Sequence, residues 1–207
     1  MHQALALLEF ANVSVGVLAV DRMLKKSPVA LLRCGSVHPG RYLALVGGSV
    51  ASTQEAHAAG AAVGCERNAL VDEVFLGDPH PLLNAAVMGE RVTPAGDAVG
   101  LCEISTSPGL LRLMDALLKD VPIGLVEIRL ADDLGGHALA VFDGDLPSVQ
   151  EALDMVSVRL GSTAQQLGSA LLPRVDETLR EVLGTGTRFG ACANWTPEGA
   201  EILQTEG

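Results

Sequence analysis

The chain has 207 residues, of which 48% are hydrophobic and only 3% aromatic, so we expect a core of Leu, Val and Ala. Its net charge of −11 argues against the basic face that nucleic-acid binding needs, and no apolar run reaches the roughly 18 residues of a membrane span. The N-terminal segment lacks the basic start and small-residue cleavage site of a signal peptide, which predicts a cytoplasmic protein.

The first part of the chain alternates between strand and helix patterns, with apolar runs and helical spacing separated by Pro and Gly. The expected elements are a strand at 4–10, a helix at 14–26, strands at 29–34 and 42–48, an Ala-rich helix at 50–63, a strand near 70–76 and a short helix after the prolines at 79 and 81.

The second part repeats the first. A shift of 94 residues superimposes the pairs Glu9 and Glu103, Asp21 and Asp115, Lys25 and Lys119, Pro28 and Pro122, and Leu31 and Leu125. Beyond a loop the shift becomes 96, so that Gly40 meets Gly136 and Gly48 meets Gly144. The second loop is therefore two residues longer. A repeat of this length indicates two copies of a small domain rather than a solenoid.

The order β-α-β-β-α-β-α in each copy predicts a ferredoxin-like α+β fold, with a four-stranded antiparallel sheet and helices on one face. We expect a first domain at 1–88, a polar linker at 89–97, a second domain at 98–184 and a C-terminal arm at 185–207. Trp195 is the only tryptophan, and it could pin this arm to the body or to a neighbouring molecule.

No catalytic motif is present: the chain has no G-x-S-x-G, no H-E-x-x-H and no P-loop, so we predict that it is not an enzyme. His57 is expected to be a solvated histidine on the second helix. The cysteines form no C-x-x-C pair, which favours free, buried thiols and no resident cofactor. They stand at Cys34, Cys65, Cys102 and Cys192.

The ordered segments "ALALLEF", "DRMLKKSPVALL", "GRYLALVGG", "QEAHAAG" and "LVDEVFLGDPHPLL" resemble the bacterial microcompartment shell domain. Two fused copies resemble the tandem-domain shell proteins, and residues 1–90 are most similar to the non-permuted subtype of propanediol-type compartments. This resemblance implies a homotrimer that imitates a hexameric tile, with a central pore for the passage of metabolites, or of electrons or a metal. It also implies other shell hexamers and pentamers, and encapsulated enzymes, as partners.

The resemblance assigns contacts at the tile edge to several residues. Lys25 and Lys119 match the lysine that packs against its counterpart on a neighbouring tile, although each could equally be a surface lysine that ends a helix. Arg174 matches an arginine that reaches the adjacent tile, and His80 matches the family histidine. The other copy has Asp78 and Asp176 at these two positions, so we expect the edges of the tile to alternate.

The resemblance also implies that the two loops of each chain line the pore. The expected pore-lining residues are Val37, His38, Pro39 and Gly40 from the first copy, and Asp132, Asp133, Leu134, Gly135 and Gly136 from the second. Glycines are expected there because a constriction needs close approach and positive φ angles. The paired aspartates would favour neutral or cationic solutes, with Arg41 and His137 offsetting part of their charge.

His38 stands where the similar subtype has "CPGK", whose cysteine holds an iron–sulphur cluster on the axis. The sequence leaves three roles open for it: a loop histidine that only lines the pore, a constriction that gains charge as pH falls, or a metal site made by three imidazoles. A different function also remains open, namely a trimeric ferredoxin-like sensor that binds a metabolite or a metal.

Overall fold

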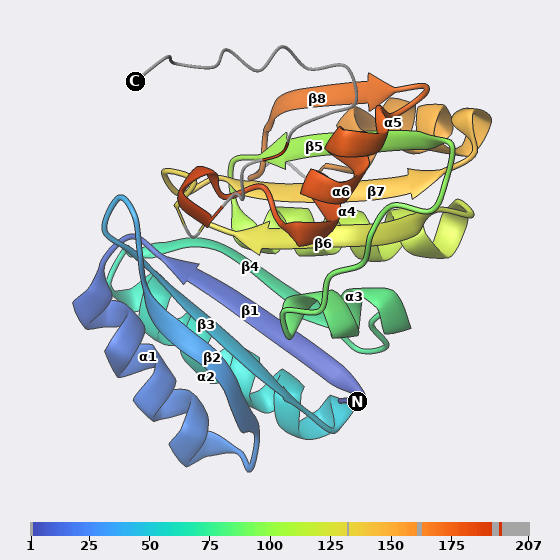
Figure 1. Ribbon diagram of the computed structural model, residues 1–207. Helices are drawn as coiled ribbons and strands as arrows, with labels where there is room; N and C mark the ends of the chain where they lie inside the picture. Colours follow the sequence, from blue (N-terminus) through green and yellow to red (C-terminus); the bar gives the residue numbers. More distant parts are fainter. Residues whose placement is uncertain (1, 132, 161–162, 192–194, 196–207) are drawn as a thin grey trace, which may run out of the picture.

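The computed structural model describes residues 2–131, 133–160, 163–191 and 195 (Figure 1). The first copy comprises β1 (Ala4–Phe10), α1 (Val13–Lys26), β2 (Ala30–Val37), β3 (Arg41–Gly48), α2 (Val50–Glu66), β4 (Leu70–Leu76) and α3 (Pro81–Val87). The second comprises β5 (Ala98–Ile104), α4 (Ser107–Asp120), β6 (Gly124–Leu130), β7 (Ala138–Gly144), α5 (Leu146–Arg159), β8 (Gln166–Leu172) and α6 (Glu177–Thr185), followed by a 3₁₀ turn at Phe189–Ala191.

Both copies form the same four-stranded antiparallel sheet, with strand orders β2-β3-β1-β4 and β6-β7-β5-β8. The two registers agree residue by residue: Glu9 pairs with Leu43, and Glu103 pairs with Leu139. Irregularities in the pairing also recur at equivalent positions, between Leu31 and Arg33 in one copy and between Leu125 and Glu127 in the other. The predicted α+β fold of two fused domains is therefore confirmed.

Local sequence signals explain where the helices begin and end. The side chains of Asn12 and Thr106 cap α1 and α4 by accepting hydrogen bonds from backbone N–H groups three residues later. Pro28 and Pro122 follow the ends of the same two helices, and neither helix continues past its proline. These signals recur in both copies, so each fold can be traced to its own segment of sequence.

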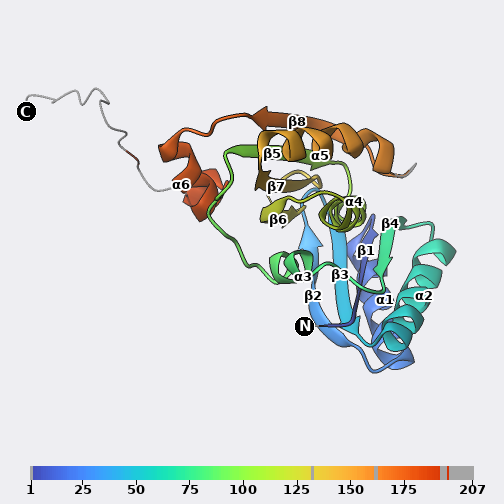
Figure 2. The ribbon, with the colours of Figure 1, turned by 90° about the vertical axis from the view of Figure 1, so that its right-hand side faces the viewer.

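The two long helices of each copy cover one face of its sheet, as expected, whereas the short third helix lies against the other face and not with them (Figure 2). In the first copy Leu83 and Val87 of α3 are buried in the cluster that contains Leu5 and Leu45. In the second copy Leu183 of α6 joins a cluster on the equivalent face. The cluster around α3 continues into the core of the second copy, so the apolar interior runs across the boundary between the copies.

The segment between α3 and β5 is attached to the second copy. The backbone N–H groups of Ala95 and Gly96 donate to Asp143 Oδ2 at 2.6 and 2.7 Å, and Arg180 donates to the carbonyls of Pro94 and Gly96, each at 2.8 Å. The expected linker is therefore held against the second copy by hydrogen bonds.

Two expectations about single side chains are wrong. Cys34 and Cys65 are exposed, and only Cys102 is buried among the described cysteines, whereas the sequence suggested buried thiols. His57 is not solvated: its side chain is only 17% exposed, because α2 places it against Glu73 and Phe75 of β4. Across the described residues, no helix is long and apolar enough to cross a membrane.

Candidate functional site: loops and the seam between the copies

The two predicted pore loops lie side by side within one chain, on the left of Figure 1. A methyl group built on Gly136 would lie 3.1 Å from Pro39 Cδ and 3.4 Å from Arg41 Cζ. The loops therefore meet where the two sheets adjoin, although almost a hundred residues separate them along the chain.

Both loops use backbone conformations that favour glycine. The φ angles of Gly40, Gly135 and Gly136 are +99°, +62° and +88°, in agreement with the expected positive values. Asp133 also has a positive φ, of 62°. Asp132 lies outside the described residues.

The guanidinium group of Arg41 lies between the two copies, beside the second loop and against a buried carboxylate. Its Nη1 contacts the buried carboxylate of Glu9 at 2.5 Å and also approaches the carbonyl oxygens of Ser105 and Gly136 in the second copy, at 3.3 and 3.4 Å. The other carboxylate oxygen of Glu9 accepts from the backbone N–H of Ser107 at 2.9 Å. Arg41 and Glu9 thus tie the two copies together.

Burial raises the pKa of Glu9, while the hydrogen bond from Ser107 and the contact with Arg41 oppose that rise. Glu9 has no exposed surface at all, so removing one of these partners would leave a poorly paired charge in the interior. The interface between the two copies, which we call the seam, therefore contains the ion pair between Arg41 and Glu9, and groups from both copies hold this pair in place.

The negative charge of the second loop is partly offset within the chain. The Asp133 carboxylate lies 3.4 Å from Nε of Arg188, a residue beyond α6, so part of its charge is offset. The Leu134 side chain packs against the cluster beneath α6. In contrast, His38 and His137 are exposed. Within one chain, no group of three His, Cys, Asp or Glu residues that could hold a metal ion is found among the described residues.

The two candidate edge lysines have different surroundings. Lys25 contacts Asp21 at 2.8 Å, and its side chain is 72% exposed. Lys119 makes the equivalent contact with Asp115 at 2.7 Å but also donates to the carbonyl oxygen of Asp78 at 2.6 Å. Lys119 is therefore held at the boundary between the copies, whereas Lys25 has no such second partner in the part of the chain that the structure describes.

The alternation between His80 and Asp176 has a local explanation. His80 Nδ1 accepts from the N–H of Leu82 at the start of α3, and Asp176 accepts from the N–H groups of Thr178 and Leu179 at the start of α6. Both residues cap helices. The backbone N–H of His80 also donates to Asp115 Oδ1 at 2.8 Å, across the seam. Arg174 is exposed, just after β8.

A second polar cluster in the seam was not predicted. Asp72 on β4 accepts from Thr106 Oγ1 at 2.6 Å and from Arg112 Nη2 at 3.0 Å, and Arg112 also donates to the carbonyl oxygen of Glu73 at 2.8 Å. The repeat contained a signal for it, because Arg112 stands where the first copy has Leu18. An arginine in an apolar position of only one copy indicates a contact that only that copy makes.

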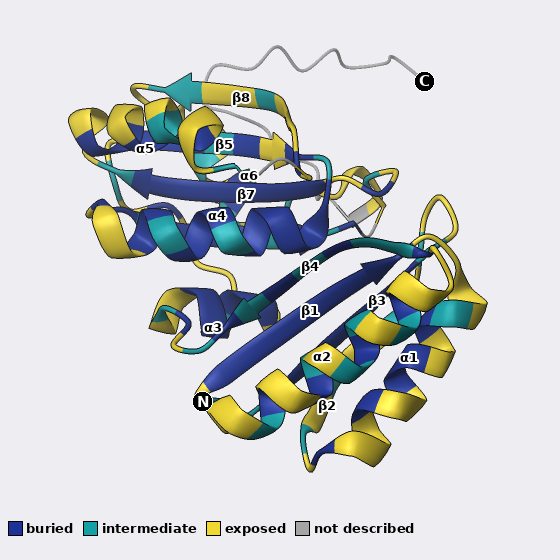
Figure 3. Cartoon of the chain, turned by 180° about the vertical axis from the view of Figure 1, so that it is seen from behind, coloured by how far each residue is buried: buried dark blue, intermediate teal, exposed yellow. Residues whose placement is uncertain are grey.

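The contact between the copies buries one face of α4, whereas the equivalent face of α1 is exposed. Leu111 and Leu118 of α4 are 0% and 6% exposed, whereas Val17 and Leu24, their counterparts on α1, are 52% and 42% exposed. Figure 3 shows this difference as a mostly buried α4 and an α1 with a broad exposed face.

The surface of the first copy that contacts the second copy also has an exposed counterpart, which lies on the second copy. Glu9 is fully buried, but its counterpart Glu103 is exposed. Leu83 of α3 is 0% exposed, whereas Leu179 of α6 is 40% exposed, and β8 carries Leu167 with 45% exposure. Each chain therefore has one buried contact between its two copies. It also has two exposed surfaces, one on each copy, that correspond to the two sides of that contact.

Comparisons with known proteins agree with the duplicated fold. The BMC domain family matches residues 4–79 and 98–175. The bacterial microcompartment shell protein PduT of Citrobacter freundii is 29% identical over 179 residues, which are 86% of this chain and 96% of that protein. The carboxysome assembly protein CcmO of Synechocystis sp. is 24% identical over 196 residues, 89% of this chain and 65% of that protein.

A crystal structure of a microcompartment protein from Desulfitobacterium hafniense DCB has the same fold, with a TM-score of 0.72 and 25% identity over 87% of this chain and 99% of that one. The family matches cover most of the sequence and coincide with the two sheets. The chain therefore belongs to the BMC domain family and is a shell protein of a bacterial microcompartment rather than an enzyme.

Proposed function

We propose that three copies of this chain close head to tail into a pseudohexameric shell tile with a central pore for small metabolites. The observation that carries this proposal is the unequal burial of α1 and α4. Val17 is 52% exposed on α1, while Leu111, at the same place on α4, is completely buried by the first copy. Large apolar side chains exposed together on one helix face indicate a surface that another molecule covers.

The seam inside the chain supplies the geometry of the proposed contact. Within the chain, α4 packs against β1 and β4, and α3 packs against β6. In the assembly, α1 of one chain would pack in the same way against β5 and β8 of the next chain. In return, α6 of the next chain would pack against β2 of the first chain. Glu103 of the next chain would then accept from the N–H of Val13 of the first chain, as Glu9 accepts from the N–H of Ser107 within one chain. A head-to-tail contact of this kind closes into a ring when its rotation is a simple fraction of a turn.

Such a ring would bring six loops around one axis, because each chain contributes its two adjacent loops. His38 and Gly40 would alternate with Asp133 and Gly135. The observed contact between Asp133 and Arg188 supports a rim of moderate negative charge, through which polar metabolites would pass. The tile would lie in the shell of a cytoplasmic compartment, beside other shell hexamers and pentamers and above encapsulated enzymes.

Three His38 imidazoles on the axis could hold a metal ion. One chain supplies one exposed imidazole in this loop, so a site of this kind requires the trimer. Elemental analysis of the purified trimer tests the metal. Stoichiometric zinc or iron that is lost in His38→Ala would support a metal site, and its absence from both proteins would contradict one.

Sedimentation velocity tests the assembly. We expect the wild type to sediment as a trimer of the 21.4 kDa chain. Val17→Asp should give monomers, because it buries a charge in the proposed contact. Val158→Asp is the matched control, since Val158 on α5 is 80% exposed and outside this contact. A monomeric wild type, or a trimer unaffected by Val17→Asp, would contradict the proposal.

Electron microscopy separates a tile from a trimeric sensor. A tile should form sheets or tubes when it is concentrated. A sensor should remain as separate trimers, and a metabolite or metal ligand should raise its melting temperature.

A further inference from the structure

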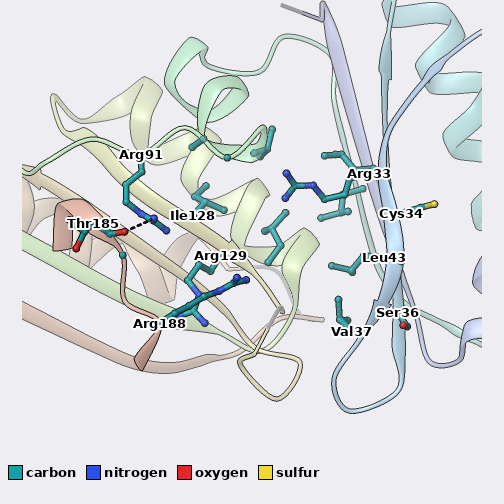
Figure 4. Close-up of a pocket in the computed structure, with 18 residues that line it drawn as sticks. Arg33, Cys34, Ser36, Val37, Leu43, Arg91, Ile128, Arg129, Thr185 and Arg188 are labelled. Carbon is teal, nitrogen blue, oxygen red and sulfur yellow. Dashed lines mark hydrogen bonds between the residues drawn. The ribbon is translucent and has the colours of Figure 1, made fainter. Parts of the chain in front are cut away.

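A cavity of about 530 Å³ lies between the two copies, on the side of the first sheet that faces away from α1 and α2 (Figure 4). One wall consists of β2 and β3. The opposite wall consists of the end of β6, the linker and the segment that follows α6. Cavities that bind small molecules typically measure about 300–1,000 Å³, so this one is large enough for a metabolite.

Four arginines line the cavity, and no acidic side chain is among the described residues that line it. Arg33 extends from β2, while Arg91, Arg129 and Arg188 come from the opposite wall, and Figure 4 shows their guanidinium groups projecting into the space between the walls. Because guanidinium groups match the geometry of carboxylates and phosphates, the polar part of the cavity is suited to an anion.

The arginines of the far wall are held in place by the chain. Arg91 contacts the buried carboxylate of Glu127 and donates to the carbonyl oxygen of Thr185 at 3.0 Å. Arg129 donates to Thr187 Oγ1 at 2.9 Å, and Arg188 lies beside Asp133. These contacts orient the guanidinium groups before any ligand arrives, which lowers the entropic cost of binding, while Glu127 and Asp133 offset part of the charge of Arg91 and Arg188.

Arg33 differs from these three. It is exposed and makes no hydrogen bond or ion pair with any residue in the described part of the chain. Its Nη2 lies near Gly89, where a methyl group would be 3.8 Å away. The fold does not require a cation at this position, because its counterpart in the second copy is Glu127, which has only 1% exposure and pairs with Arg91.

Much of the remaining lining is apolar. Its walls include Leu7, Leu43 and Leu45 of the first sheet, Val87 of α3 and Ile128 of β6. A ligand with a charged head and a short aliphatic body would satisfy both parts of this lining. In contrast, Cys34 and Ser36 point away from the cavity and offer no nucleophile to its contents (Figure 4).

We propose that this cavity binds a small organic anion, with its carboxylate or phosphate between Arg33 and the facing arginines and its aliphatic part against the leucines of the first sheet. Val37 lines the cavity and is followed directly by His38, so the bound anion would lie beside the loops. This site goes beyond the pore function, because all of the residues that line it belong to one chain.

Methyl spectra of protein labelled at Leu and Val test the proposal directly. The probes are butyl phosphate, butyrate, 1-butanol and butylammonium, which share an aliphatic body and differ in the head group. We expect one or both anions to shift the methyl resonances of Leu43, Leu45 and Val87 to saturation, whereas butanol and butylammonium should leave them in place. The stronger of the two anions identifies the head group.

Arg33→Gln should weaken anion binding about tenfold or more, since it removes a charged hydrogen-bond donor. Arg33→Lys should have an intermediate effect. Arg67→Gln is the matched control. Arg67 is exposed at the end of α2, on the other face of the first sheet, and does not line the cavity, so this variant should bind as the wild type does.

Equal shifts with butanol and the anions, no shifts with any probe, or unchanged binding in Arg33→Gln would overturn the proposal. The oligomeric mass is measured on the same samples. If a monomer binds the anion, this inference stands and the proposed tile is contradicted. If the protein is a trimer and binds no anion, the proposed tile stands and this inference is contradicted.

Discussion

Val17 and Leu111 occupy the same place in the two copies, yet Val17 is 52% exposed and Leu111 is fully buried. The difference arises because the first copy covers α4, while no described part of the single chain covers this face of α1. The two copies can therefore be compared position by position. Each residue that is buried between the copies identifies an equivalent residue on the other copy that lacks this contact.

The cluster around Asp72 should contribute measurably to the closed seam. Arg112→Ala removes the hydrogen bonds to the carboxylate of Asp72, a residue that is 6% exposed, and to the carbonyl oxygen of Glu73. We expect the free energy of unfolding to fall by about 1–3 kcal/mol. Urea denaturation at fixed protein concentration measures this. Arg159→Ala is the control, because its contact with Asp120 is largely exposed and should be worth less than about 1 kcal/mol. Equal losses in the two variants would show that the cluster has no special role.

His57 should make stability depend on pH. Burial lowers its pKa, although nearby Glu73 opposes this, so the unfolded chain binds a proton more readily than the folded one. The stabilising contribution is therefore present above the unfolded pKa of about 6.5 and is lost as pH falls through that value toward the folded pKa. Urea denaturation at pH 7.5 and 5.5 should show a smaller difference for His57→Gln than for the wild type. An unchanged difference would rule out this source.

The two glycines of the second loop should differ in their tolerance of a side chain. Gly135 has nothing within 4 Å of a built methyl group, so Gly135→Ala should lose only about 1 kcal/mol through its positive φ. Gly136→Ala should lose more, about 2–3 kcal/mol, because its methyl group would also crowd Pro39 and Arg41. Thermal unfolding of both variants checks the order, and the reverse order would mean that the loops do not meet as described.

Lys25 should affect assembly between tiles but not the stability of a tile. Its only described contact is the exposed pair with Asp21, so Lys25→Ala should change the unfolding free energy by less than about 0.5 kcal/mol. Electron microscopy should nevertheless show fewer sheets or tubes. Lys119→Ala should also reduce stability, because it removes the hydrogen bond to Asp78. Unaltered sheets in both variants would remove these lysines from the tile edge.

Most of the fold could be predicted because local signals determine it. The strand at 4–10 agrees with β1, and Pro28 correctly marks the end of α1. The strand predicted at 29–34 continues to Val37 in the structure, because pairing with β3 extends it through Gly35 and Ser36. Those two residues carry no apolar pattern, so this extension depends on a partner strand that the local sequence does not reveal.

The candidate site was harder to predict because its contacts join residues that are distant in sequence. Arg41 stands beside a loop in the sequence, but the buried carboxylate of Glu9 and two carbonyl groups of the second copy draw it into the seam. Asp133 likewise meets Arg188 from beyond α6. Comparing the two copies position by position gives the best available signal, as the exchange of Leu18 for Arg112 demonstrates.

Cross-linking between differently tagged chains tests the central claim most directly. One chain carries Asn12→Cys and the other Gly168→Cys, at the counterparts of Thr106 and Asp72, with Cys34, Cys65 and Cys192 replaced by serine. If α1 of one chain packs on β8 of the next, a short bismaleimide should join the two tags in high yield, and Val158→Cys in place of Asn12→Cys should not. Absence of the mixed product, in protein whose cysteines react fully, would contradict the proposed seam between chains.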